Sequence, residues 1–105
     1  MAQKEIIELL KKYVLLLNAQ GISVKKAYLF GSHASGLATE DSDIDIMIVS
    51  DKHDESDDRV IGKMWRLTRQ VDPKIEPLLV SMDRFMSNEE TPLIATIKNQ
   101  GIAIA

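Results

Sequence analysis

The chain has 105 residues and a mass of 11.8 kDa, which is the size of a single domain. Hydrophobic residues make up 45% of it and charged residues 28%, a composition typical of a folded protein. A net charge of −3 argues against a basic nucleic-acid-binding surface, and the lack of Cys excludes disulfides, thiolate metal sites and thiol catalysis. No apolar run approaches the ~18 residues of a membrane span, and the N-terminus lacks a signal-peptide layout. We therefore expect one cytoplasmic domain over residues 1–105.

The first half of the chain predicts a helix, a strand, a polar turn and a second strand. Helical spacing of apolar residues predicts a helix over Gln3–Gln20, which Gly21 ends. Residues 24–30 predict a short strand, and the small polar residues 31–42 predict a turn-rich connection. Strict alternation predicts a strand over 43–49, with Asp43, Asp45, Met47 and Val49 on one face and Ile44, Ile46 and Ile48 on the other.

The second half predicts two more helices and two more strands. We expect a helix over 58–71, whose buried side holds Val60, Ile61, Met64, Trp65 and Leu67. Residues 75–80 predict an edge strand, since Pro77 removes a ladder donor. A capping-box pattern at 87–90 predicts a helix over 92–99, followed by Gly101 and a short strand at 102–105. The fold class is α/β: a small mixed sheet backed by helices on one face and open on the other.

Two aspartates carry the clearest chemical signal. Asp43 and Asp45 are two residues apart on a predicted strand, so their side chains project from the same face. Like charges this close repel each other unless a cation lies between them. Mg²⁺ suits this position, because proteins hold it with one or two carboxylates and leave the remaining ligands to water and substrate phosphates.

A Gly-Ser turn lies ten residues before these aspartates. Gly31 lets the backbone approach a phosphate closely, and Ser32 offers a hydroxyl and begins a short helix whose positive end would face the anion. Either motif alone has an ordinary structural explanation, as a turn or a solvated strand. When both motifs occur in one strand–turn–strand unit, as they do here, they predict a nucleotide-binding site. A P-loop and a dinucleotide-binding glycine pattern are absent, and an EF-hand would need Gly at Ile46 and Glu at Lys52.

The segment LFGSHASGLATEDSDIDIMIVS resembles the signature of the DNA polymerase β-like nucleotidyltransferase superfamily. The resemblance is strongest to the small, stand-alone minimal nucleotidyltransferase (MNT) domains, and implies a polymerase β palm-like fold. By this resemblance Asp43 and Asp45 bind two magnesium ions, and Gly31, Ser32 and Ser42 bind the nucleotide.

The resemblance also implies a third carboxylate on the later strand that completes the catalytic metal site. Glu76, the acid inside 75–80, is the candidate for this metal ligand, and it could also deprotonate the attacking hydroxyl. A solvated edge-strand residue remains the alternative for Glu76. Relatives often carry basic side chains after the Gly-Ser pair, where this chain has His33 and Ser35. That difference weakens neutralisation of a triphosphate.

Similar minimal domains are paired with a HEPN protein, a helical toxin, and transfer AMP from ATP to one of its tyrosines. The resemblance implies the same antitoxin role here. Two alternatives stay open: a non-catalytic antitoxin that binds and occludes its partner, and transfer to a small molecule, with a site built in a homodimer. Candidates for an apolar partner surface are Leu37, Met82, Phe85 and Met86.

Overall fold

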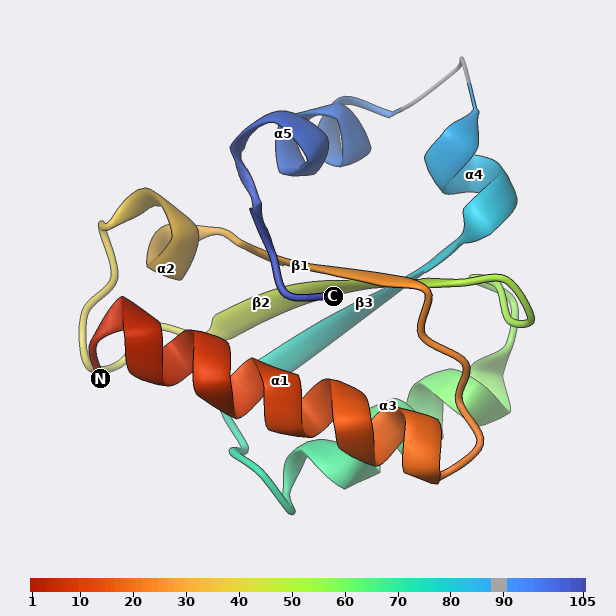
Figure 1. Cartoon of the computed structure of the whole chain (residues 1–105), viewed down its shortest axis with the longest axis horizontal. Coiled ribbons are helices and arrows are strands. Elements are labelled where there is room, and N and C mark those ends of the chain that lie inside the picture. Colours follow the sequence, from red (N-terminus) through yellow and green to blue (C-terminus); the bar gives the residue numbers. More distant parts are fainter. Residues whose placement is uncertain (88–90) are drawn as a thin grey trace.

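The order of helices and strands follows the sequence pattern closely (Figure 1). The computed structural model describes residues 1–87 and 91–105. Its elements are helix α1 (Gln3–Ala19), strand β1 (Lys26–Phe30), helix α2 (Ser32–Ser35), strand β2 (Ile44–Ser50), helix α3 (Asp58–Thr68), strand β3 (Ile75–Ser81), helix α4 (Met82–Met86), helix α5 (Pro92–Gln100) and strand β4 (Ile102–Ala103). The short helix α4 was not expected; Ser81 caps it, with its hydroxyl accepting from the amide of Arg84 at 3.2 Å.

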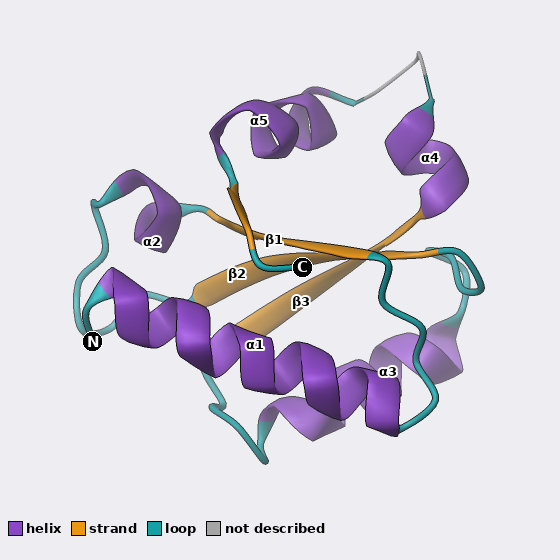
Figure 2. Ribbon diagram, in the orientation of Figure 1, coloured by secondary structure: helices purple, strands orange, loops and turns teal. Residues whose placement is uncertain are grey.

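The four strands form one mixed sheet in the order β3-β2-β1-β4 (Figure 2). Strand β1 is antiparallel to both β2 and β4, whereas β2 and β3 run parallel, joined by the crossover helix α3. The mixed sheet of the predicted fold class is thus confirmed. Pro77 lies in β3 at the edge of the sheet, as its missing donor predicts.

Helices cover both faces of the sheet, which differs from the expected single covered face. Helices α1 and α3 pack on the face that carries Ile44, Ile46 and Ile48. Helices α4 and α5 pack on the other face, over Met47 and Val49. The predicted alternation of β2 is therefore correct. Both faces of β2 are apolar after Asp45, so each face is buried by helices that pack against it.

Several side chains lie elsewhere than their sequence pattern predicted. Trp65 is 44% exposed rather than buried in α3, while Phe85, a surface candidate, belongs to the core. The capping box at 87–90 falls largely outside the described residues, and Thr91 caps α5 instead, accepting from the amide of Ile94 at 3.3 Å. Among the described residues, no helix combines the length and apolarity needed to cross a membrane.

Candidate active site

The predicted site residues gather where β1 ends and β2 begins. Gly31 follows the last residue of β1 and has a φ of +75°, a region that favours glycine. Ser32 is the first residue of α2, whose first amides have no acceptor inside their own helix. The connection then returns the chain antiparallel to β1, so that Asp45 pairs with Phe30, next to the Gly31 turn.

Two strands bring the carboxylates together. The parallel register places Asp45 of β2 beside Glu76 of β3. Asp43 lies just before β2 and is exposed, while Asp45 and Glu76 are half-buried. The structure therefore brings all three predicted acids together in one cluster, while Glu76 lies partly exposed on the edge strand β3 and its metal role stays a prediction.

Burial and the neighbouring carboxylates change the pKa values of Asp45 and Glu76. Burial, and then the negative charges of Asp43 and Asp45, raise the pKa of Glu76. Burial also raises the pKa of Asp45, where the Asp43 charge adds to it and two effects oppose it: a hydrogen bond with Glu76 and the nearby His33. Burial is thus the main cause of both shifts, and the neighbouring carboxylates add to it; a bound cation would favour the charged forms of these groups.

Gly31 is in direct contact with this cluster. A Cβ at Gly31 would overlap Oδ2 of Asp45 and lie 3.3 Å from its Cγ. The backbone of the turn thus approaches the Asp45 carboxylate as closely as a residue without a side chain permits. A phosphate held at the turn would lie next to the same carboxylate.

The other predicted contacts are placed less directly. The hydroxyl of Ser42 accepts from the amide of Thr39 at 2.9 Å, which closes the loop before β2, and its nucleotide role stays a prediction. His33 is near enough to Asp45 to lower its pKa. The hydroxyl of Ser35 donates to the carbonyl of Ser32 at 3.2 Å inside α2.

The basic residues of α3 lie away from the carboxylates. Met64 and Leu67 of this helix pack against the Ile44, Ile46 and Ile48 face of the sheet, whereas Asp45 is on the opposite face. The side chain of Lys63 donates instead to the carbonyl of Gln20 at 2.7 Å.

A cavity that the sequence did not reveal adjoins the turn. It has a volume of about 380 Å³ and lies between Gly31, α2 and α5, with Leu93, Thr96 and Gln100 from α5 on its wall. The capping-box pattern predicted a helix over 92–99 but gave no indication of which earlier residues this helix would face. Only the return of the chain to β4, beside β1, places it against Gly31.

The carboxylate oxygens of Asp43, Asp45 and Glu76 are of the ligand type that Mg²⁺ prefers. Among residues 1–87 and 91–105, no three or more His, Cys, Asp and Glu side chains are arranged to hold a metal ion on their own. Mg²⁺, however, requires only one or two protein carboxylates when substrate phosphates and water complete its octahedron. Asp45 and Glu76, which pair in the parallel register of β2 and β3, and Asp43 just before β2 fit a site of that kind.

Comparison with known proteins agrees with this geometry. A family model described as a nucleotidyltransferase domain matches residues 4–103. The chain is similar in fold to the crystal structure of a Sulfolobus solfataricus protein that is named, provisionally, a nucleotidyltransferase. The TM-score is 0.63 and the sequence identity is 18%. The aligned region covers 97% of this chain and 81% of that protein's chain. No curated protein matches. The chain belongs to the nucleotidyltransferase domain family, and nucleotidyl transfer is the general activity that this membership supports.

Proposed function

We propose that this chain transfers AMP from ATP to a hydroxyl group of another protein, with Mg²⁺ as the cofactor. The observation that carries the proposal is the cluster of Asp43, Asp45 and Glu76 in contact with the Gly31 turn. Carboxylates for a metal and a glycine turn for phosphate are the two parts that metal-assisted phosphoryl-group chemistry needs.

The acceptor we propose is a tyrosine of a HEPN-type helical toxin, which the chain would neutralise as an antitoxin in the cytoplasm. The resemblance to minimal nucleotidyltransferases supports this choice. The exposure of Asp43 and the half-buried positions of Asp45 and Glu76 add to it, because a hydroxyl on the surface of another protein can reach them. The cavity that adjoins Gly31 offers room for part of a bound nucleotide next to the turn.

The residues divide the chemistry between them. The amides of the Gly31-Ser32 turn hold and orient the phosphates, and His33 adds a donor nearby. Asp43 and Asp45 would hold Mg²⁺, which neutralises charge on the phosphates. Glu76 accepts the proton of the attacking hydroxyl as its oxygen bonds to the α-phosphorus. The bond from that phosphorus to the bridging oxygen breaks, and pyrophosphate leaves.

Label transfer tests the proposal. The purified chain is incubated with Mg²⁺ and α-labelled ATP, alone and with extract of its native cells. We expect a labelled protein band with the wild type and with Asp41→Asn, which changes an exposed acid of the same loop. Asp45→Asn should reduce labelling at least about a hundredfold, since it removes a charged metal ligand from the cluster. Labelling that survives Asp45→Asn would contradict the proposed mechanism.

A second candidate is an antitoxin that acts by binding alone. The lack of arginines after the Gly-Ser pair, where this chain has His33 and Ser35, favours it, because a triphosphate would be neutralised less completely. In this case no labelled band appears, while a helical protein is retained by the chain equally well with and without ATP and Mg²⁺. Retention of that protein by Asp45→Asn would then separate binding from transfer.

A further inference from the structure

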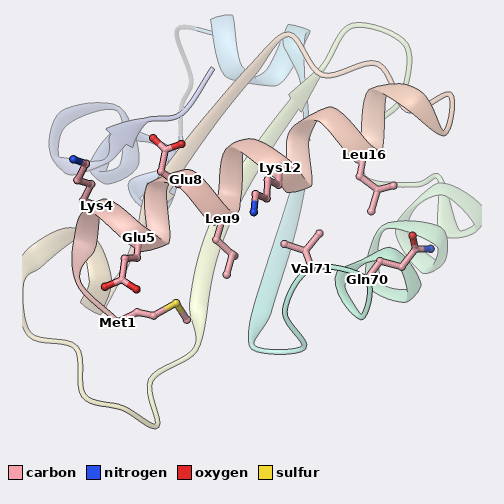
Figure 3. Close-up of a pocket in the computed structure, with 9 residues that line it drawn as sticks. All are labelled: Met1, Lys4, Glu5, Glu8, Leu9, Lys12, Leu16, Gln70 and Val71. Atoms are coloured by element: carbon pink, nitrogen blue, oxygen red, sulfur yellow. The ribbon is translucent and has the colours of Figure 1, made fainter.

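A groove runs along the outer side of α1 (Figure 3). Helix α1 covers the face of the sheet opposite to the one from which Asp45 projects. It has a volume of about 640 Å³ and lies between α1 and the residues that follow α3. Its apolar wall is formed by Leu9, Leu16 and Val71, which are partly buried, and Met1, which is 60% exposed, lies at one end. A groove lined in this way leaves apolar surface in water that a partner could cover.

Charged side chains of both signs accompany this apolar wall. Lys4, Glu5, Glu8 and Lys12 also line the groove and are all exposed. Since a helix repeats every 3.6 residues, Glu5, Lys12 and Leu16 form one stripe along α1, and Met1 precedes the helix at its N-terminal end. An acidic position in the first half of the stripe is therefore matched by a basic position in the second half.

Glu5 and Lys12 are seven residues apart, which is close to two helical turns, so they lie on the same side of α1. Their midpoint falls between residues 8 and 9. If a second α1 lies antiparallel across the groove, with a two-fold axis at that midpoint, Glu5 of each copy faces Lys12 of the other. Leu16 of each copy then lies toward the N-terminal end of the other α1, and Leu9 and Glu8 lie next to the axis.

We propose that a second copy of this chain occupies the groove, forming a two-fold dimer through antiparallel α1 helices. An interface of this type uses the same patch on both subunits, so it requires a patch that is complementary to itself. The groove meets that requirement in charge, through the two Glu5–Lys12 pairs, and in apolar contact, through its ends and its centre. A partner of a single charge would leave half of these side chains opposed by like charge.

The dimer leaves both carboxylate clusters free. Helix α1 packs on the Ile44, Ile46 and Ile48 face, and Asp45 projects from the other face of β2. Two copies joined through α1 therefore direct their candidate active sites away from each other. The proposal is independent of the proposed transfer reaction and can be tested without substrate.

Sedimentation velocity over a range of concentrations tests the dimer. We expect the wild type to reach twice the 11.8-kDa chain mass. Glu5→Lys or Lys12→Glu places two like-charged pairs across the axis and should weaken association by at least about tenfold. The double variant Glu5→Lys/Lys12→Glu restores opposite charges and should dimerise like the wild type.

Two controls make the result specific. Lys11→Glu makes the same charge change at the neighbouring position, outside the groove, and should leave dimerisation unchanged. Glu5 also accepts from the amide of Ala2 at 3.2 Å, so circular dichroism is measured for each variant, and Lys12→Glu tests the interface without disturbing this contact. A wild type that is monomeric at all concentrations would overturn the proposal. So would a dimer that single charge reversals do not weaken, or that the double variant fails to restore.

Discussion

Gly31 combines a backbone requirement with a chemical one. Its φ of +75° is costly for any residue with a Cβ, and a Cβ there would also overlap the Asp45 carboxylate. Gly36 at the other end of α2 has a similar φ of +80°, yet a Cβ there would meet nothing within 4 Å. The two glycines thus share the conformational cost, and only Gly31 adds a contact with the candidate site.

This difference predicts the outcome of two matched substitutions. Gly31→Ala and Gly36→Ala should each lower the free energy of unfolding by about 1–2 kcal/mol, measured by urea denaturation, because both force alanine to a positive φ. Only Gly31→Ala should also reduce nucleotidyl transfer, by about a hundredfold, since it displaces Asp45. Equal transfer rates for the two variants would show that close approach at Gly31 is not needed for activity.

Within the helical layer, a single buried hydroxyl joins α1 to α3. The Tyr13 side chain is fully buried and its hydroxyl donates to the carbonyl of Met64 at 2.8 Å. Burial raises the pKa of this phenol, so it stays protonated and remains a donor. The hydrophobic spacing of α1 predicted that Tyr13 would face the core, but the carbonyl it meets belongs to a helix 51 residues further along the chain.

Tyr13→Phe should therefore destabilise the protein without emptying the core. The expected loss is about 1–2 kcal/mol in the free energy of unfolding, since the ring stays in place and one buried hydrogen bond disappears. Tyr28→Phe is the matched control, because the half-buried Tyr28 keeps its ring contact with Phe85, at 5.8 Å between centroids. Its effect should stay within about 0.5 kcal/mol. A loss as large for Tyr28→Phe as for Tyr13→Phe would contradict this assignment.

For the molecule as a whole, the sheet is the centre of two hydrophobic cores. Ile48 belongs to the core under α1 and α3, and Met47 to the core under α4 and α5. Neighbouring residues of one strand therefore contribute to opposite sides of the molecule. Each side chain is inaccessible to solvent, so neither face of β2 at this point is a free surface.

Truncating either neighbour should have a large effect. Ile48→Ala and Met47→Ala should each cost about 2–5 kcal/mol in thermal or urea unfolding, because both create a cavity in a closed core. Leu15→Ala, at a position that is 69% exposed on α1, should change stability by no more than about 0.5 kcal/mol. A small effect of Met47→Ala alone would mean that α4 and α5 do not form a real second core.

The sequence could predict much of the fold because its signals are local. Alternation in 43–49 and helical spacing in 3–20 depend on periods of 2 and 3.6 residues, which hold whatever the rest of the chain does. Trp65 shows the limit of such signals. Its spacing suits the apolar side of α3, but how far around a helix the core reaches depends on the elements packed against it, and here Trp65 lies beyond that boundary.

The candidate site divides in the same way between sequence and structure. The chain alone determined that Asp43 and Asp45 would share a face and that Gly31 would end a strand, since these are matters of spacing and backbone freedom. Only the tertiary structure decided that Glu76 joins them, that α5 adjoins Gly31, and that the outer groove of α1 remains open. These contacts depend on strand order and register, which bring together residues distant in the sequence and which no local pattern encodes.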